Sequence, residues 1–251
     1  MRRPAAHCRA VRRREQSVDN AYSREWYETF LDPIPTDTTR AEVVFVERQL
    51  PLVSFPAILD LCCGPGRHAA ALSQIGYRVV GVDANESAVQ IARARCPGAS
   101  FTVCDMRSLD SLATSFDGVV NLWHSFGYFD DEANRDVLRQ VRAVLRPGGR
   151  AIFDIYNREH FANRPTEEIT ERGGRQIRTA RSWSGSRHRV ALEYDGVPGD
   201  HFEWRLYSPS EFREQCTSAA LETLLACAWF DEATPPSPEH ARMQFVVERA
   251  A

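Results

Sequence analysis

The sequence predicts an α/β fold with one doubly wound, mostly parallel sheet, and two observations support this prediction. Short apolar strands alternate with amphipathic helices from about residue 56 to residue 157. Beyond residue 163 apolar and polar residues alternate with a period of two, which is typical of antiparallel strands. Because strand–helix–strand units close by right-handed crossovers, we expect a parallel sheet, an antiparallel last strand and a small antiparallel β insert after the fifth strand.

The strands and helices of the sheet can be placed by their flanking residues. The first five strands are expected at AILDL, YRVVGVD, SFTVCD, FDGVVNLW and RAIFDIY. Gly76 ends the helix AAALSQIG, and Asn85 is the expected N-cap of the helix NESAVQIARARC. The amphipathic helix DEANRDVLRQVRAVLRPGG ends at Pro147-Gly148-Gly149. A last helix capped by Ser208 or Ser210 precedes LLACAWF and MQFVVER, the expected closing strands.

Two helices are expected before the sheet. In VDNAYSREWYETFLD, one helical face gathers Tyr22, Trp26 and Phe30, and prolines follow at positions 33 and 35. A second helix is expected from Thr36 to Gln49. We interpret residues 18–50 as a helical lid, and the arginine-rich residues 1–17 as a disordered tail.

The period-two segments lie within residues 164–207, at EEITERGGRQIRTARSW, RHRVALEYDG and DHFEWRLYS. They are too few and too interrupted by glycine for an independent domain. We therefore expect residues 164–207 to form an inserted β cap for the substrate. The main domain then comprises residues 51–163 and 208–251.

Composition narrows the class of partner. The chain has 251 residues and a net charge of −3, which provides no basic surface for a nucleic acid. No apolar run approaches the roughly 20 residues of a membrane span. The seven cysteines are scattered, which fits the reducing cytoplasm rather than a disulfide framework. We expect a cytoplasmic protein with a small-molecule substrate and neither nucleic acid nor membrane as partner; a homo-oligomer is left open.

Three motifs follow one another along the first three strands: ILDLCCGPG at 58–66, VDANE at 82–86 and CDM at 104–106. The carboxylate of Asp83, at the tip of the second strand, can accept hydrogen bonds from both hydroxyls of a ribose. A dinucleotide fingerprint would read G-x-G-x-x-G. The turn here has Cys62, Gly64 and Gly66, so that match fails and a nucleoside without a pyrophosphate is expected.

These motifs resemble those of the class I S-adenosylmethionine-dependent methyltransferases, whose fold is Rossmann-like. The resemblance implies S-adenosyl-L-methionine as cofactor, S-adenosyl-L-homocysteine as product and no metal. It places Asp60, Gly64 and Gly66 against the methionine part, Asp83 on the ribose, and Asp105 with the Met106 amide on the adenine. The expected cofactor site is completed by Tyr27, Cys62, Arg67, Ala84, Leu122 and Trp123. Cys62 departs from the family, which usually has glycine there.

The acceptor is expected after the fourth and fifth strands, because ligands bind at the carboxyl ends of sheet strands. His124 can accept a proton near neutral pH, and a purely structural role for it is the alternative. We take His124 and Tyr22 as the candidate catalytic residues. The candidate substrate residues are Phe126, Tyr128, Tyr156, Asn157, Arg205 and Tyr207.

The resemblance also narrows the reaction. The fourth strand ends in Asn121-Leu122-Trp123-His124, which lacks the carboxylate ligands of a magnesium-dependent catechol-type O-methyltransferase. The Asn/Asp-Pro-Pro-Tyr signature of many protein and DNA N-methyltransferases is also absent. The remaining resemblance is to small-molecule, natural-product N-methyltransferases, such as those of antibiotic biosynthesis that act on amino sugars. Methylation of oxygen or carbon, methylation of RNA, and a non-catalytic nucleoside-binding protein are the alternatives.

Overall fold

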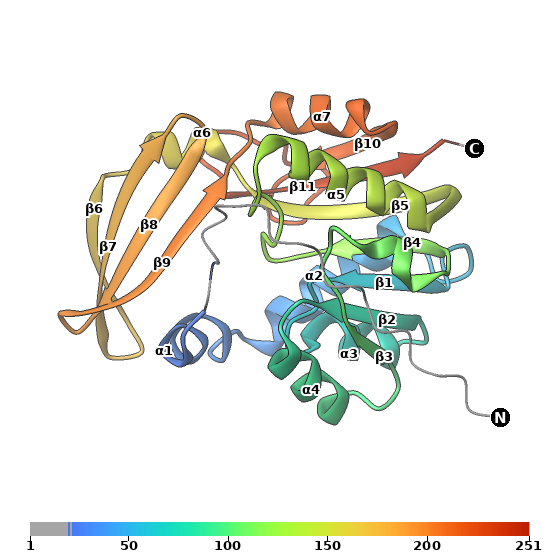
Figure 1. The fold of residues 1–251 in the computed structure, drawn as a ribbon, viewed down its shortest axis with the longest axis horizontal. Helices are drawn as coiled ribbons and strands as arrows, with labels where there is room; N and C mark the ends of the chain where they lie inside the picture. Colours follow the sequence, from blue (N-terminus) through green and yellow to red (C-terminus); the bar gives the residue numbers. More distant parts are fainter. Residues whose placement is uncertain (1–19, 21, 251) are drawn as a thin grey trace.

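The computed structural model describes residues 20 and 22–250, and the expected tail at 1–17 lies outside them. A 7-stranded sheet has the order β10-β11-β5-β4-β1-β2-β3 (Figure 1). Its strands are β1 (Ala57–Leu61), β2 (Arg78–Asp83), β3 (Ser100–Val103), β4 (Phe116–Asn121), β5 (Leu145–Tyr156), β10 (Leu221–Cys227) and β11 (Arg242–Arg249). Strand β11 pairs antiparallel with both β5 and β10, whereas β1 to β5 pair in parallel. The predicted fold class is confirmed.

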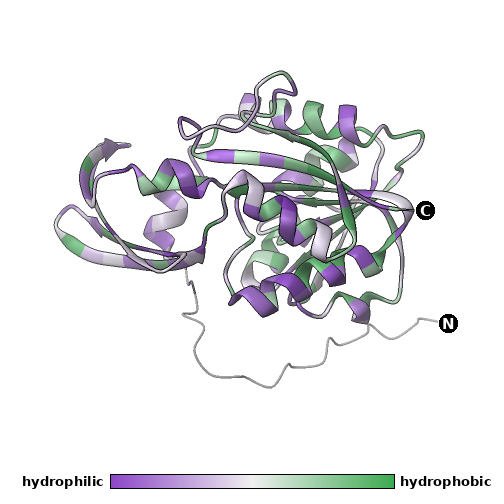
Figure 2. Ribbon diagram, turned by 90° about the horizontal axis from the view of Figure 1, so that it is seen from above, coloured by the Kyte–Doolittle hydropathy of each residue, from purple (hydrophilic) through white to green (hydrophobic). Residues whose placement is uncertain are grey.

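Helices cover both faces of this sheet. One apolar cluster joins it to α5 (Asp131–Val144) and α7 (Pro209–Ser218), and the other joins it to α2 (Thr36–Gln49), α3 (Arg67–Gln74) and α4 (Glu86–Arg95). Their ribbons carry both hydrophilic and hydrophobic residues, as amphipathic helices do (Figure 2). No helix within residues 22–250 is long and apolar enough to cross a membrane.

Local capping determines where the helices begin. The Asn85 side chain accepts a hydrogen bond from the Ala88 amide, as the sequence predicts. Ser208 and Glu211 form a capping box at α7. The predicted end of α5 was wrong by a few residues, because the helix stops at Val144 and β5 starts at Leu145. Pro147 has no backbone amide hydrogen, and its ring disfavours helical geometry in the residue before it, so the helix ends earlier.

An antiparallel cap sheet follows β5 and the short helix α6 (Arg158–Ala162). It consists of β6 (Glu167–Arg172), β7 (Arg175–Ser184), β8 (Arg187–Tyr194) and β9 (Val197–Arg205), and it stands beside the main sheet (Figure 1). Its inner face, defined by Ile177, Leu192, Tyr194, Phe202 and Trp204, forms a third apolar cluster with aromatic rings from the rest of the chain.

The N-terminal segment is bound to the cap sheet. It contains α1 (Arg24–Trp26) and a π-helical turn, η1 (Tyr27–Leu31). The side-chain amide of Asn20 donates through Nδ2 to the Glu203 carbonyl at 2.9 Å, and its Oδ1 accepts from the Glu203 backbone amide at 2.8 Å. These two bonds occupy the edge of β9. The Ser23 amide and hydroxyl both donate to the Asp200 carboxylate.

The cap meets the main domain at Gly127. The Arg205 amide donates to the Gly127 carbonyl at 2.7 Å. Gly127 has a φ of +104°, and a Cβ added there would lie 2.4 Å from the Arg205 carbonyl oxygen. Only glycine therefore allows the loop after β4 to approach the end of β9 this closely.

We predict that Gly127→Ala lowers the free energy of unfolding by about 2–4 kcal/mol, through backbone strain and steric overlap. Urea denaturation would measure the loss. Gly185→Ala is the matched control, because Gly185 has a φ of +60° but its added Cβ meets nothing within 4 Å, so about 1 kcal/mol is expected. Equal losses in the two variants would contradict a close approach at Gly127.

Candidate functional site

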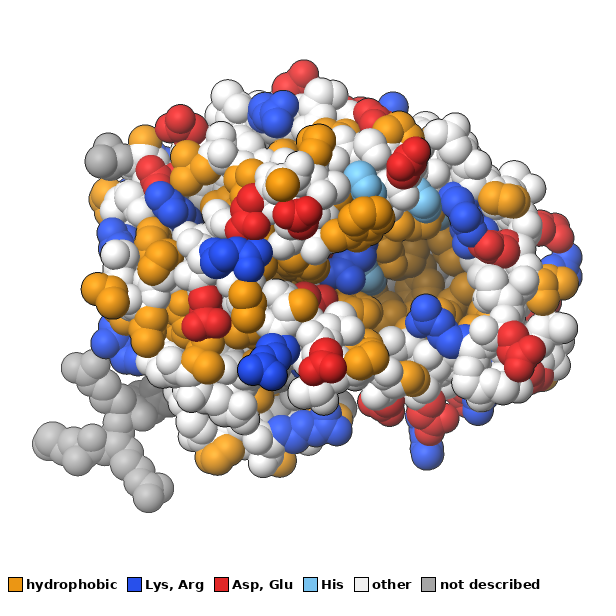
Figure 3. Space-filling view, turned by 180° about the vertical axis from the view of Figure 1, so that it is seen from behind, with side chains coloured by type: hydrophobic (Ala, Val, Ile, Leu, Met, Phe, Trp, Pro, Cys, Tyr) orange, Lys and Arg blue, Asp and Glu red, His pale blue; other side chains and the backbone are white. Residues whose placement is uncertain are grey.

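The candidate site lies where the strand order reverses, at the carboxyl ends of β1 and β4. The space-filling view shows a hollow with hydrophobic walls between the main domain and the cap, with arginine and histidine side chains at its floor and rim (Figure 3). Most of the predicted site residues lie on elements that end at this crevice.

The turn after β1 provides a buried carboxyl group. Asp60 is 2% exposed, and its Oδ2 atom has no hydrogen-bond partner among the described residues. Burial raises the pKa of Asp60 to about 7, although a hydrogen bond from the Ala69 amide opposes the rise. Gly64 and Gly66 follow with positive φ; the space beside Gly64 is open, whereas a Cβ on Gly66 would lie 2.9 Å from that of Ala92.

Asp83 links this turn to the end of β2. Its Oδ2 accepts from the Gly64 amide and its Oδ1 from the Asn85 amide, each at 2.8 Å. Burial raises the pKa of Asp83, and hydrogen bonds from backbone amides, including that of Ala84, limit the rise. Its charge helps to raise the pKa of Tyr27, so the lid tyrosine lies near this carboxylate. A carboxylate held by backbone amides at this position can still accept hydrogen bonds from a diol.

In the third motif, the side chains of Asp105 and Met106 make contacts within the fold. The Asp105 carboxylate pairs with the Arg107 guanidinium, whose central carbon lies 4.2 Å from the centre of the Phe129 ring. Met106 is buried, and its sulfur lies 4.0 Å from the sulfur of Cys62. Cys62 has a φ of +62°, the conformation that explains why the family favours glycine there. The thiol of Cys62 thus packs on Met106.

Two consecutive residues after β4 have left-handed backbone conformations. Trp123 has a φ of +63° and His124 a φ of +49°. This conformation costs about 1–3 kcal/mol for each residue and persists only where neighbouring contacts compensate for it. Asp154 on β5 holds both, because its carboxylate accepts from the Trp123 amide at 2.9 Å and its carbonyl from the His124 amide at 2.8 Å. Such strain is typical of functional sites. Leu122, just before them, is packed in the core.

A buried charge network, centred on Glu42 of α2, supports this turn. The Glu42 carboxylate accepts from Trp123 Nε1 and His68 Nε2 at 2.8 Å and from Arg67 Nη1 at 2.9 Å. Arg242 lies 3.5 Å from it and also pairs with Asp154. Burial raises the pKa of Glu42, but the hydrogen bond from His68 and the charges of Arg67 and Arg242 outweigh it and lower the pKa to about 2.

An aromatic cluster covers His124. The His124 ring stacks on Tyr156 with centroids 3.9 Å apart, and the Tyr22 hydroxyl bonds to that of Tyr128. Tyr22 contacts Phe202 on the inner face of the cap. Burial raises the pKa of all three tyrosines, so their hydroxyls stay protonated at neutral pH. Burial and the charge of Arg242 lower the pKa of His124, whose Nδ1 has no partner among the described residues.

Four predicted substrate residues are occupied by contacts within the fold. Phe126 and Tyr207 pack on Phe212 in the core below α7. Asn157 is fully buried and caps α6. Arg205 is 8% exposed and pairs with Asp131. The structure therefore brings His124, Tyr22, Tyr128 and Tyr156 together and leaves these four outside the cluster.

Sequence reasoning missed the three charged residues that organise the floor of the site: Glu42, Asp154 and Arg242. Glu42 and Asp154 each lie within an apolar segment, AEVVFV and AIFDIY, where a buried carboxylate requires a partner. That signal could have identified the two acids. It could not have identified Arg242, which lies 88 positions after Asp154.

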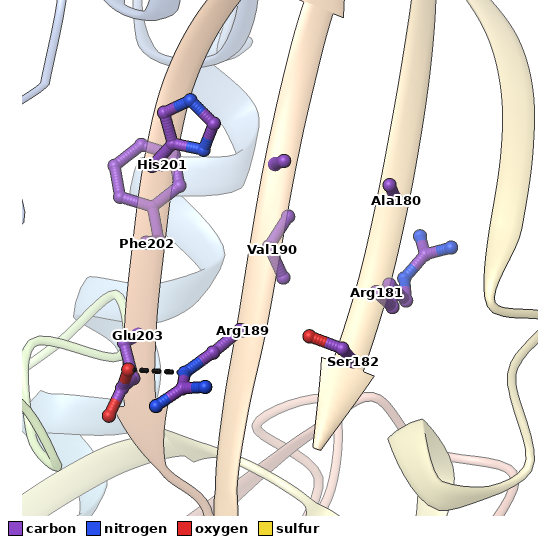
Figure 4. Close-up of a pocket in the computed structure, with 9 residues that line it drawn as sticks. Ala180, Arg181, Ser182, Arg189, Val190, His201, Phe202 and Glu203 are labelled. Atoms are coloured by element: carbon purple, nitrogen blue, oxygen red, sulfur yellow. Dashed lines mark hydrogen bonds and ion pairs between the residues drawn. The ribbon is translucent and has the colours of Figure 1, made fainter. Parts of the chain in front are cut away.

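A separate groove of about 430 Å³ lies on the cap sheet, across β7, β8 and β9 (Figure 4). Ala191 and His201 line it and alternate along their strands with inner-face residues, so it opens on the opposite face. The ion pair between Arg189 and Glu203, 2.6 Å long, forms part of its wall. No group of three or more metal-ligating side chains occurs at this groove or elsewhere in the part of the chain that the structure describes.

Comparisons with known proteins agree with this geometry. Residues 58–149 match the model of a methyltransferase domain. A putative methyltransferase of Geobacillus sp. is 28% identical over 137 residues, which are 53% of this chain and 55% of that protein. The chain therefore spans about half the length of this relative.

Two solved structures share the fold. An S-adenosylmethionine-dependent methyltransferase from Clostridium acetobutylicum has a TM-score of 0.75 at 15% identity, covering 90% of this chain and 97% of its own. An amino pentose methyltransferase from Micromonospora echinaspora, bound to S-adenosylmethionine and involved in calicheamicin biosynthesis, has a TM-score of 0.68 at 18% identity, covering 92% and 99%.

We predict that Glu42→Gln lowers the free energy of unfolding at pH 7 by about 3–5 kcal/mol, because Arg67 and Arg242 lose a buried anion. The folded pKa of about 2 lies below the ordinary 4.5, so the ionised carboxylate stabilises the fold above pH 4.5 and loses this effect as the pH falls towards 2.

Denaturation of both proteins between pH 7 and pH 3 would test this, since the difference between wild type and variant should shrink below pH 4.5. Glu47→Gln, on the exposed face of the same helix, is the control and should change little. A difference independent of pH would show that Glu42 acts through its shape and not through its charge.

Proposed function

We propose that the chain is a class I S-adenosylmethionine-dependent methyltransferase that methylates the nitrogen of a small-molecule amine in bacterial secondary metabolism, and the match of residues 58–149 to a methyltransferase domain supports the first part. The observation that carries the proposal is the buried aromatic cluster over His124. Its polar groups are protonated tyrosine hydroxyls and the Nδ1 atom of a histidine that burial keeps neutral. Such a pocket suits an uncharged amine more than a cation or a polyanion.

The residues at the turn after β1 fit the cofactor. The unpartnered Oδ2 of Asp60 and the open space beside Gly64 suit its methionine part, and Asp83 suits the ribose diol. Tyr27 lies near Asp83 and would close over the cofactor from the lid. When bound, S-adenosylmethionine supplies a methyl group already activated by the positive charge on sulfur.

The chain's own residues would bind and orient the acceptor and exclude water from it. The aromatic rings exclude water, and the Tyr22 and Tyr128 hydroxyls can each hydrogen-bond to a polar atom of the acceptor. His124 has an unpartnered Nδ1 in a neutral ring, so it can accept a hydrogen bond from the N–H of the acceptor and orient the nitrogen being methylated. Asp154 and Glu42 act as positioning residues, because they hold the backbone of Trp123 and His124.

The choice of nitrogen has one further support. The Micromonospora neighbour is described as an amino pentose methyltransferase, and it shares the fold over 92% of this chain. The proposed acceptor residues are narrowed to His124, Tyr22, Tyr128 and Tyr156. We assign structural roles to the other four predicted substrate residues, Phe126, Asn157, Arg205 and Tyr207.

We expect S-adenosylhomocysteine to bind wild type with micromolar affinity in calorimetry, and Asp83→Ala to weaken binding at least about 100-fold, because two charge-assisted hydrogen bonds are lost. Asp136→Ala, on the exposed side of α5, should bind as wild type does. Transfer of a labelled methyl group from the cofactor to a panel of amines and phenols tests the reaction itself. Label on phenols alone would contradict N-methylation, and absence of cofactor binding would overturn the proposal.

A second prediction concerns pH. Because burial raises the pKa of Asp60 to about 7, its carboxylate is ionised above that pH and largely neutral below it. The affinity for S-adenosylhomocysteine should therefore fall as the pH decreases from 8 to 6, a range in which the ligand's amino group carries a proton. Asp60→Asn should bind weakly with little dependence on pH. An unchanged pH dependence in that variant would assign the titration to another group.

A further inference from the structure

Two arginines are cross-strand neighbours at the turn that joins β6 to β7 in the cap sheet. Arg172, the last residue of β6, is paired in register with Arg175, the first residue of β7. Only Gly173 and Gly174 separate them, and both glycines have positive φ, as tight two-residue turns require. The two guanidinium groups are therefore held as direct cross-strand neighbours.

Both side chains belong to the inner face of the cap. Ile177, an inner-face residue, pairs with Thr170, and Arg172 and Arg175 lie two positions further along each strand. The central carbon of the Arg172 guanidinium lies 5.1 Å from the centre of the Phe30 ring. A cation–π contact of this kind orients Arg172 without neutralising it.

This position is within electrostatic reach of the acceptor residues. The positive charge of Arg172 acts against the rise in the pKa of Tyr156 that burial causes. Tyr156 stacks on His124, so the charge of Arg172 acts on the aromatic cluster that covers His124.

The carboxylates of the inner face leave the pair without full compensation. Glu168 is engaged by Arg164 and Arg181, and Asp200 by Ser23 and Tyr194. Within residues 22–250, Arg172 has no ion pair, and Arg175 has a single long one, 3.9 Å from Glu28. Like charges directly opposite each other destabilise a hairpin, so an anion between them would relieve a repulsion.

We infer that Arg172 and Arg175 bind an anionic group of the acceptor, a carboxylate or a phosphate ester, while its amine lies in the aromatic cluster. This inference rests on the proposed function and specifies its substrate class. Guanidinium groups bind both kinds of anion through paired hydrogen bonds, which fixes orientation as well as affinity. The acceptor is thus an amine with a remote negative charge.

The test is a titration of the protein saturated with S-adenosylhomocysteine, using inorganic phosphate and then acetate at constant ionic strength. Tryptophan fluorescence gives the signal, because the Trp26 ring lies 5.7 Å from that of Phe30. The variants are Arg172→Gln and Arg175→Gln. The matched control is Arg178→Gln, which removes the same charge from the opposite face of the same strand, where Arg178 pairs with Glu167.

We expect the dissociation constant of the anion to rise at least about tenfold in Arg172→Gln and Arg175→Gln and less than twofold in Arg178→Gln. Binding of acetate through the same arginines assigns a carboxylate, whereas binding of phosphate alone assigns a phosphate ester. No anion binding by wild type, or an equal loss in all three variants, would overturn the inference. The proposed function would still stand in that case, provided that wild type binds S-adenosylhomocysteine. Failure of wild type to bind S-adenosylhomocysteine would overturn both.

Discussion

The buried carboxylate of Asp154 is the interaction on which the architecture of the site depends. It is inaccessible to solvent, so it is tolerated only because it is fully bonded. Its partners come from two parts of the chain: Arg242 and Gln244 on β11, and the backbone of Trp123 after β4. One anion therefore links the pairing of β11 with β5 to the shape of the crevice floor.

Most of the fold could be predicted because its signals are local. Apolar runs located the strands, and Asn85 and Ser208 marked helix starts through hydrogen bonds to residues only three positions away. The charge network could not be predicted in this way. Glu42, Asp154 and Arg242 lie far apart in the sequence, and an acid within an apolar pattern indicates that a partner exists without indicating which residue it is.

The proposed acceptor residues show the same limit at a finer scale. Tyr156 and Asn157 are neighbours at the end of β5, yet one stacks on His124 and the other caps α6. Phe126 and Tyr128 diverge in the same way, because Gly127 between them adopts a φ open only to glycine. The direction of a side chain after a strand depends on the backbone turn there, which the alternation of apolar and polar residues does not describe. The sequence therefore predicted all four as substrate residues from their residue types alone.

The bonds from Asn20 and Ser23 attach the first part of the lid, before α2, to the cap sheet. Residues 22–31 and the cap sheet would therefore be exchanged as one unit, although more than a hundred residues separate them in the chain. A chimera that receives a relative's cap without its N-terminal helix would lose the partners of Glu203 and Asp200 at the edge of β9. Exchange of the cap between relatives that share this fold thus requires exchange of the N-terminal segment as well.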